Sequence, residues 1–270
     1  MNEEIRRFIE SYKFFMPFGN GNFPVIAQLT DGCIRGFPGA LNRLISEKLE
    51  LPEILRVDEV YSYHPKETEL ERVFKRHGTY KPGPCYRLYA HLLDDIVKTK
   101  ATSSLAMLEI GLGTSNTEIV SNMGASHASG SSMYAWSDFL PNARIFGADV
   151  DRGAIFQDPA RRIATFEVDQ TKVETLERLK EEIGSVSFFI DDGLHSIESS
   201  LNSLSIGIEM LSVPGCLVIE DISPHGLFFW RVIWSLFEGH SNYDTKLYHS
   251  TAGGGIFTLT SKKLSDLTEE

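Results

Sequence analysis

The sequence predicts an α/β fold with a mostly parallel central sheet, and three observations support this prediction. Apolar runs of four to six residues recur in the second half of the chain, and segments with helical periodicity separate them. Such alternation is typical of buried parallel strands joined by crossover helices. Near the C-terminus, Thr245–His249 and Ile256–Thr260 flank a glycine-rich turn and predict an antiparallel hairpin. Five parallel strands and this hairpin give an expected sheet of seven strands.

The chain divides into two expected parts. Residues 1–75 contain an amphipathic start and a charged run, Lys66–Lys75, with apolar positions at helical spacing. We expect a mainly helical N-terminal extension here, which serves as a cap or an oligomerisation segment. Residues 76–270 form the α/β domain. Its clearest helices are predicted at Tyr89–Lys98, Lys172–Ile183 and Ile197–Leu211.

Each of the five predicted parallel strands ends in a carboxylate. Ligands of an open α/β sheet bind outside the carboxyl ends of its strands, so the acids mark the edge where an active site is expected. The strands and their acids are Leu105–Leu108 before Glu109, Arg144–Ala148 before Asp149, Ile163–Val168 before Asp169, Val186–Ile190 before Asp191 and Asp192, and Cys216–Ile219 before Glu220 and Asp221.

Composition restricts the partners of the chain. A net charge of −11 and an isoelectric point near 5.2 argue against nucleic acid and against an anionic membrane surface. The sequence contains no apolar stretch suited to a membrane span, and Met1–Arg7 lacks the character of a signal peptide. The three cysteines, Cys33, Cys85 and Cys216, lie far apart without metal-binding spacing. A reduced, cytoplasmic protein is therefore expected.

A glycine turn follows the first strand and predicts a cofactor site. Gly111 and Gly113 permit a tight turn and the close approach of a ligand, with Thr114 and Ser115 beside them. Asn116 stands where a dinucleotide fingerprint requires a small residue. Glu109, directly before the turn, can pair with a cationic ligand, and S-adenosylmethionine carries both an ammonium and a sulfonium group.

The next two strand ends complete the expected cofactor site. Asp149 suits the hydroxyls of a ribose, and Asp151 is a competing candidate for that role. Asp169 and Gln170 are well placed for an adenine amine. Each acid taken alone is also compatible with a helix N-cap or a loop.

The last two parallel strands predict the chemical part of the site. Clustered carboxylates without thiolates suit a hard divalent ion such as Mg²⁺. His195, at the start of the next helix, can remove a proton from a substrate hydroxyl. Neighbouring side chains of a strand point to opposite faces, so only one of Asp191 and Asp192 is expected to face the metal.

Four segments then resemble a known family. The resemblance covers residues 75–262 and is to class I S-adenosylmethionine-dependent methyltransferases, which have a Rossmann-like fold. Within this class, the segments are similar to the metal-dependent sugar O-methyltransferases of macrolide and related natural-product pathways, of the mycinamicin and macrocin type. Tyr80 departs from the pattern, because the family usually has aspartate there. The segments are His77–Lys81, similar to H-G-T-D-K; Met133–Asp149, similar to the second strand and its approach; Asp191–His195, similar to D-D-G-S-H; and Val218–Asp221, similar to I-E-D.

The resemblance implies roles for individual residues. It implies a Mg²⁺ site at Asp192, Glu220 and Asp221, and His195 as the general base. It also implies an S-adenosylmethionine site, with a sugar-bearing or phenolic small molecule as methyl acceptor and a homo-oligomeric enzyme. The cofactor residues expected from the residues and the resemblance together are Glu109, Gly111, Gly113, Thr114, Ser115, Asp149, Asp169, Gln170 and Asp191.

Other functions remain open from the residues alone. A catechol or phenol O-methyltransferase would use the same chemistry. A nicotinamide-dependent oxidoreductase shares the strand–glycine–helix start, although Asn116 and the acid cluster argue against it. A non-catalytic scaffold is a third class, and it gives no reason for an acid cluster beside His195.

Overall fold

The computed structural model describes residues 39, 43, 51–61, 67–79, 81, 83–99, 105–119, 122–124, 128–224, 226–250 and 254–261. The chain separates into two compact units, Met1–Pro52 and Glu53–Glu270. All elements below belong to the second unit. The expected helical extension falls largely outside the described residues, as does Tyr80. The division of the chain between residues 75 and 76 stays a prediction.

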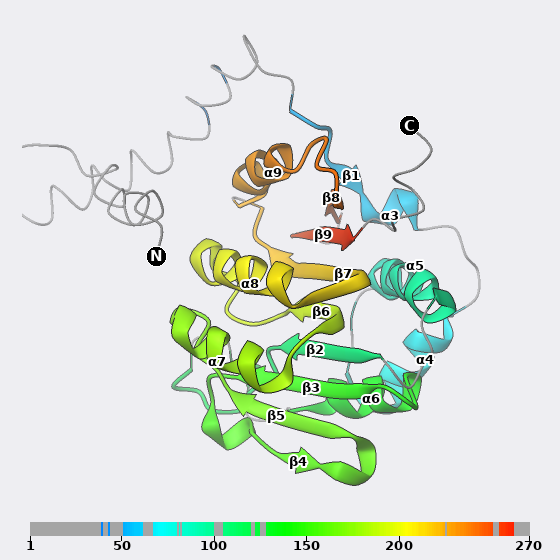
Figure 1. The fold of residues 1–270 in the computed structure, drawn as a ribbon, viewed down its shortest axis with the longest axis vertical. Coiled ribbons are helices and arrows are strands. Elements are labelled where there is room, and N and C mark those ends of the chain that lie inside the picture. Colours follow the sequence, from blue (N-terminus) through cyan, green and yellow to red (C-terminus); the bar gives the residue numbers. More distant parts are fainter. Residues whose placement is uncertain are drawn as a thin grey trace, which may run out of the picture. The chain divides into compact units, whose positions relative to one another are not determined.

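A mixed sheet forms the centre of the second unit and confirms the predicted fold class (Figure 1). Five strands are parallel, and the predicted C-terminal hairpin adds two antiparallel strands. Two strands of two residues each, β1 and β4, extend the edges to nine strands in the order β1-β8-β9-β7-β6-β2-β3-β5-β4. The strands are β1 Leu55–Arg56, β2 Ala106–Ile110, β3 Arg144–Asp149, β4 Gln157–Asp158, β5 Ile163–Glu167, β6 Val186–Asp191, β7 Leu211–Ile222, β8 Tyr243–His249 and β9 Gly255–Ser261.

Helices cover both faces of this sheet, as the alternating sequence pattern predicts. Figure 1 shows α4, α5 and α6 on one side of the strands and α7, α8 and α9 on the other. The helices are α3 Val57–Val60, α4 Glu69–Arg76, α5 Gly83–Thr99, α6 Ser131–Phe139, α7 Val173–Ile183, α8 Ile197–Met210 and α9 Leu227–Leu236, with short 3₁₀ turns at Arg152–Ala154 and Pro159–Arg161. No described helix is long and apolar enough to cross a membrane.

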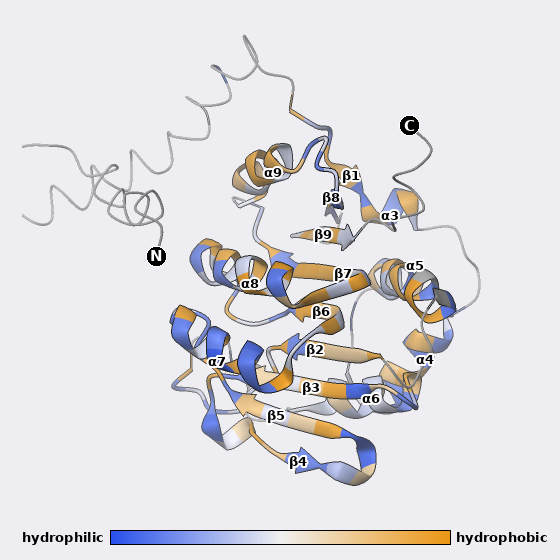
Figure 2. Ribbon diagram, viewed as in Figure 1, coloured by the Kyte–Doolittle hydropathy of each residue, from blue (hydrophilic) through white to orange (hydrophobic). Residues whose placement is uncertain are grey.

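Alternation along the strands divides the core into two apolar layers. Phe188 packs in the layer beneath α4, α5 and α6, whereas its neighbour Phe189 packs beneath α7 and α8. Figure 2 shows the resulting pattern, with hydrophobic strands at the centre and hydrophilic outer faces on α4 and α7. Strands buried on both faces read as continuous apolar runs, which explains why they could be recognised in the sequence.

Caps and apolar spacing set the helix bounds. The side chain of Thr68 accepts a hydrogen bond from the Glu71 amide and begins α4, which buries Leu70, Val73 and Phe74. In the same way Ser196 caps α8 by accepting from the Ser199 amide. The predicted helices α7 and α8 are confirmed to within a residue. Helix α5 begins at Gly83, six residues before its predicted start, since Tyr86 and Leu88 are also buried.

Register brings the acids of neighbouring strands to one edge. Ile110 of β2 lies opposite Asp191 of β6, and Asp191 in turn lies opposite Ile219 of β7. The Gly111 amide donates to the Ala148 carbonyl at 2.7 Å, and the Asp192 amide donates to the Ile110 carbonyl at 2.8 Å. These two bonds extend the hydrogen-bonding pattern of the sheet beyond the strand ends. They also connect the loops that carry the predicted site residues.

Candidate active site

A cavity of about 1080 Å³ lies at the carboxyl ends of the parallel strands. Both halves of the predicted site contribute to its wall. The cofactor half includes Glu109, Gly111 and Asp149, and the chemical half includes Asp192 and Glu220. The structure therefore brings acids from four neighbouring strands, β3, β2, β6 and β7, around one space.

The glycine turn after β2 needs its glycines. Gly111 has a φ of 103°, and a Cβ atom there would lie 2.0 Å from the carbonyl oxygen of Asp192. Gly113 has a φ of 71°, and its Cβ would lie 2.5 Å from the sulfur of Met123. The left-handed backbone disfavours a side chain at both positions, and at Gly111 the backbone of Asp192 also leaves no room for one. The turn thus exposes its backbone to the cavity.

Glu109 is held beneath this turn by a buried hydrogen bond. Its side chain is 2% exposed, and the indole of Trp136 donates to Oε2 at 2.5 Å. Burial, together with the charge of Asp192, raises the pKa of Glu109, although Lys81 and Trp136 favour the ionised form. Glu109 is the carboxylate that a cationic ligand above the glycine turn would meet.

Asp149 fastens the turn to the next strand. Its Oδ2 accepts from the Leu112 amide at 2.9 Å, and Oδ1 accepts from the Asp151 amide at 2.8 Å. Burial raises the pKa of Asp149 despite these bonds. Of the two competing candidates for a ribose contact, Asp149 lines the cavity, whereas Asp151 binds the hydroxyl of Thr114 and the Gly153 amide.

Two other predicted cofactor residues lie behind or beside the cavity wall. Thr114 is buried, and its hydroxyl also accepts from the Asn116 amide at 3.0 Å. Ser115 is exposed. Neither residue belongs to the cavity wall, so their predicted contacts to a cofactor stay predictions.

The predicted adenine end is formed by Asp169 and Gln170. Burial acts against the charge of Asp169, but bonds from Lys172 and Thr171 outweigh it and lower the pKa of this carboxyl. Gln170 accepts from the Leu194 amide at 2.9 Å and donates to Asp191 Oδ1 at 2.6 Å. It thereby connects the loop after β5 to the loop after β6.

The adjacent acids Asp191 and Asp192 face different surroundings. Asp191 is 1% exposed and lies against Gln170, and its Oδ2 is buried without a hydrogen-bond partner in the described structure. Burial raises the pKa of this carboxyl. Asp192 instead lines the cavity and contacts Lys81. Of the two, Asp192 is the one placed toward the acid cluster, and Asp191 supports the loop from behind.

Lys81 lies between the acids of β6 and β7. Its Nζ is 2.7 Å from Asp192 Oδ2 and 2.6 Å from Glu220 Oε2. Burial opposes the positive charge, yet the carboxylates outweigh it and raise the pKa of Lys81. The hydroxyl of Tyr89 donates to the other oxygen of Glu220. Burial and the charge of Asp192 raise the pKa of Glu220, although Lys81 and Tyr89 oppose this.

Asp192, His195 and Asp221 form a second grouping at the same place. One ligand atom from each lies within 4.8 Å of the others. His195 and Asp221 both have positive φ, at 57° and 48°, so local backbone geometry aims these side chains. His195 Nε2 is 4.0 Å from Asp192 Oδ1, and its Nδ1 is buried without a partner in the described structure. The two carboxylates of this grouping suit a hard divalent ion, whereas an imidazole is more typical of transition-metal sites.

Sequence reasoning missed Lys81, Tyr89 and Trp136 as members of the site. Lys81 belongs to the His77–Lys81 segment that carried the family resemblance, but no chemical role was predicted for it. Trp136 lies on α6 and is fully buried. The hydrogen bond from its indole to Glu109 joins α6 to β2, so it can be recognised only in the folded structure.

Comparison with known proteins adds to this geometry. No protein-family model matches the chain. The chain is 26% identical over 180 residues to mycinamicin VI 2''-O-methyltransferase of Micromonospora griseorubida, a match that spans 66% of this chain and 40% of that protein. It is 24% identical over 171 residues to 8-demethyl-8-alpha-L-rhamnosyl tetracenomycin-C 2'-O-methyltransferase of Streptomyces olivaceus, with 63% and 40% covered. The chain thus spans less than half the length of these curated relatives.

A solved structure shares the fold. The MycE methyltransferase of the mycinamycin biosynthetic pathway, in complex with Mg and SAH, superposes with a TM-score of 0.56 at 20% identity. The match covers 73% of this chain and 56% of that one. This likeness shows that the chain has the class I methyltransferase fold that the sequence predicts.

Proposed function

We propose that this chain is a Mg²⁺-dependent O-methyltransferase that transfers a methyl group from S-adenosylmethionine to a hydroxyl of a sugar or glycosylated natural product. The observation that carries the proposal is one cavity whose wall includes Glu109 and Asp149 together with Asp192, His195 and Asp221. The similarity to two sugar O-methyltransferases supports the acceptor class.

The cofactor half of the cavity would bind S-adenosylmethionine, which supplies a methyl group on a positively charged sulfur. Glu109 attracts the positive end of such a ligand, and the Gly111 turn allows it to approach the backbone. Asp149, which lines the cavity, would accept hydrogen bonds from the ribose hydroxyls. Asp169 and Gln170 line the same cavity at the expected adenine end.

The chemical half would bind Mg²⁺ through Asp192, Glu220 and Asp221, and the ion would lower the pKa of a bound hydroxyl. The oxygen-rich ligand set supports this choice of ion. The side chains of this half also orient the acceptor, and orientation supplies a large share of the rate in a direct group transfer.

His195 would act as the general base. Its Nδ1 is buried, so Nε2 is the ring nitrogen available to the cavity. A neutral imidazole accepts the proton of the acceptor hydroxyl at Nε2. Asp192 Oδ1, 4.0 Å away, stabilises the imidazolium that results.

The same proposal includes the setting of the enzyme. We expect a homo-oligomer in the cytoplasm, with a small molecule rather than nucleic acid or membrane as partner. The buried, free thiols of Cys85 and Cys216 support a reducing compartment. Size-exclusion chromatography with light scattering measures the oligomeric state.

Calorimetric titration with S-adenosylmethionine and S-adenosylhomocysteine, with and without Mg²⁺, tests the cofactor. Micromolar binding that weakens in Glu109→Ala is expected, and Glu118→Ala on the exposed loop is the matched control. No binding in either condition overturns the methyltransferase assignment. Binding of reduced nicotinamide instead would favour an oxidoreductase.

Transfer assays then test the metal and the acceptor. Glycosylated macrolides are expected to accept the methyl group, and a chelator is expected to abolish transfer until Mg²⁺ is restored. Full activity in excess chelator contradicts the metal-dependent mechanism. Turnover of catechols with none of glycosides would change the acceptor class and leave the chemistry intact.

A further inference from the structure

The ammonium of Lys81 occupies the space between two acids of the candidate metal site. It lies 2.7 Å from Asp192 Oδ2 and 2.6 Å from Glu220 Oε2, and its side chain is only 10% exposed. Charge-assisted hydrogen bonds of this length are among the stronger polar contacts in proteins. Asp192 and Glu220 therefore already share a cation that the chain itself supplies.

Three of the four oxygens of these two carboxylates accept hydrogen bonds from Lys81 or Tyr89. Besides the two that contact Lys81, Glu220 Oε1 accepts from the Tyr89 hydroxyl, and Asp192 Oδ1 lies 4.0 Å from His195 Nε2. Lys81 forms an ion pair with each of these two acids, whereas the contact with His195 becomes an ion pair only when the imidazole is protonated. Mg²⁺ binds carboxylate oxygens at about 2.0–2.1 Å. A divalent ion that close to these oxygens would share their immediate surroundings with a like charge.

We infer that Lys81 and the divalent ion are alternative occupants of the space between Asp192 and Glu220. The ion displaces the ammonium when it binds, and the ammonium returns when the ion leaves. This inference rests on the proposed function, from which it takes the metal. It makes Lys81 a positioning residue that keeps the buried Glu220 and the partly buried Asp192 paired, since an unpaired buried carboxylate is strongly destabilising.

Exchange has a measurable effect on affinity. A ligand that binds only one of two states has its affinity reduced by the fraction of the competent state. If the Lys81-bound state makes up nine tenths or more of the metal-free protein, removing the ammonium tightens metal binding by roughly tenfold or more. A lysine that merely held the two acids in ligand geometry would have the opposite effect, and its removal would weaken binding.

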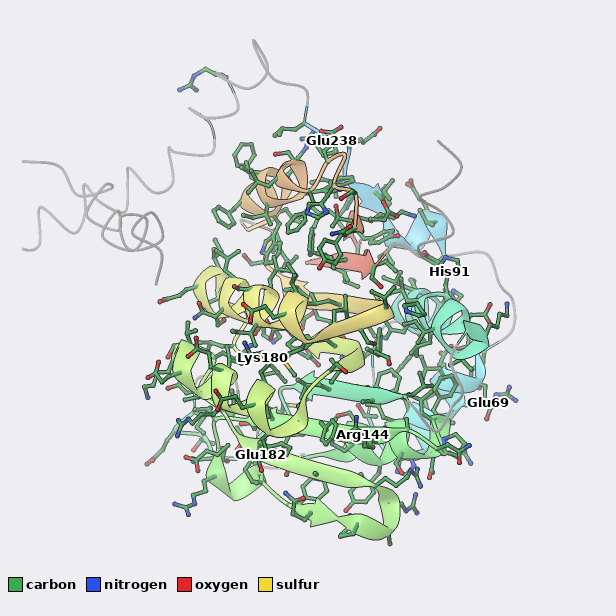
Figure 3. All side chains as sticks on the ribbon, viewed as in Figure 1. Glu69, His91, Arg144, Lys180, Glu182 and Glu238 are labelled. Atoms are coloured by element: carbon green, nitrogen blue, oxygen red, sulfur yellow. The ribbon has the colours of Figure 1, made fainter. Side chains whose placement is uncertain are left out.

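Titration calorimetry with MgCl₂ on the full chain tests whether removal of Lys81 tightens or weakens Mg²⁺ binding. Lys81→Met is expected to bind Mg²⁺ roughly tenfold more tightly than the wild type. Lys180→Met is the matched control, because Lys180 on α7 pairs with Glu209 at 2.5 Å outside the cavity wall (Figure 3). Equal or weaker binding by Lys81→Met overturns the inference and leaves the metal site standing. Absence of Mg²⁺ binding in both proteins overturns the inference and the metal-dependent mechanism together.

A second measurement uses the wild-type protein and does not depend on the folding of the variant. Lysine acetylation followed by mass spectrometry reports how accessible and free each ammonium group is. Saturating Mg²⁺ is expected to speed the labelling of Lys81 severalfold, while the labelling of Lys180 stays unchanged. An unchanged or slower rate at Lys81 under saturating Mg²⁺ means that the ammonium stays in place, and this overturns exchange.

Discussion

At the residue scale, Asp191 and Asp192 divide two tasks although they are neighbours. Asp191 lies inside with Gln170, where it fixes the loop after β6, and Asp192 faces the cavity and Lys81. The alternation of side chains along an extended chain places them on opposite sides. The structural residue and the cavity-facing residue are therefore adjacent in sequence. The hydrogen bond between Asp191 and Gln170 holds in place the loop that carries His195.

The role of His195 is open to a direct prediction. His195→Ala is expected to lower kcat by about 10²–10⁴-fold, because it removes the proton acceptor of the proposed reaction. Binding of S-adenosylmethionine should stay unchanged, since the described hydrogen bonds of Glu109 and Asp149 do not involve His195. Steady-state kinetics and calorimetry measure the two effects. His240→Ala, outside the cavity wall, is the control. An unchanged kcat in His195→Ala contradicts the assignment of the base.

At the element scale, the end of β2 and the end of β6 are built against each other. The backbone of Asp192 approaches so closely that Gly111 can carry no side chain, and Asp192 also donates to the Ile110 carbonyl. The glycine turn and the acid cluster are thus joined by one close backbone contact, between Gly111 and Asp192. A change in either loop is transmitted to the other.

Gly111→Ala tests this contact. The new Cβ would lie 2.0 Å from a backbone oxygen, and the backbone is left-handed, so we expect a loss of more than about 3 kcal/mol of stability. Gly184→Ala is the matched control. Its φ of 72° also disfavours a side chain, but nothing lies within 4 Å, so a smaller loss of about 1–3 kcal/mol is expected. Chemical denaturation measures both, and equal losses would refute the close approach.

Helix α6 is connected to its neighbours through Asp138. The imidazole of His77 lies 2.8 Å from its Oδ2, and Arg161 contacts Oδ1. The hydrogen bond to His77 and the charge of Arg161 hold the pKa of Asp138 below its usual value. Stability from such a group is complete above the unfolded pKa of about 3.9 and is lost as the pH falls through the folded pKa.

Asp138→Asn should therefore cost stability only where the carboxylate is ionised. We expect a loss of at most about 1 kcal/mol at pH 7, because the side chain is partly exposed and solvent screens the pair. The loss should fade as the pH falls below the unfolded pKa of about 3.9 and through the folded pKa, where the native carboxyl takes up its proton. Asp94→Asn, which breaks an exposed i,i+4 pair with Lys98, is the control. A difference that persists at low pH argues against the electrostatic origin.

At the scale of the whole molecule, the second compact unit begins at Glu53 and includes α4. Phe74 of this helix is fully buried and meets the Trp136 ring edge-on at 4.8 Å between centroids. Trp136 in turn donates to Glu109. A chain of packed rings thus runs from α4 to the expected cofactor site, and residues before position 76 contribute to the core.

Truncation tests the domain boundary. A chain of residues 53–270 is expected to unfold cooperatively and to bind S-adenosylmethionine. A chain of residues 76–270 loses most of α4, and loss of a buried phenylalanine alone costs about 3–5 kcal/mol. That loss approaches the whole stability of many domains. Thermal unfolding distinguishes the two chains, and equal melting temperatures would place the boundary where the sequence pattern predicts it.

Much of this architecture could be predicted from local patterns. The five parallel strands and the hairpin were predicted because buried strands read as apolar runs. Strand β1 could not be predicted, since two residues carry no periodicity and pair with β8 far along the chain. Lys81 was missed for a similar reason, because 111 residues separate it from Asp192 and 139 from Glu220. Sequence spacing indicates strand ends, but contacts across such distances depend on the tertiary fold.

The close backbone contact between Gly111 and Asp192 has a consequence for protein engineering. Directed evolution toward new acceptors will find little tolerance in that loop pair, where one substitution disturbs cofactor and metal together. Three other residues of the cavity wall, Val57, Ser250 and Ile256, lie on segments separate from that loop pair. Libraries built at these positions should yield altered acceptor preference with the methyl-transfer machinery unchanged.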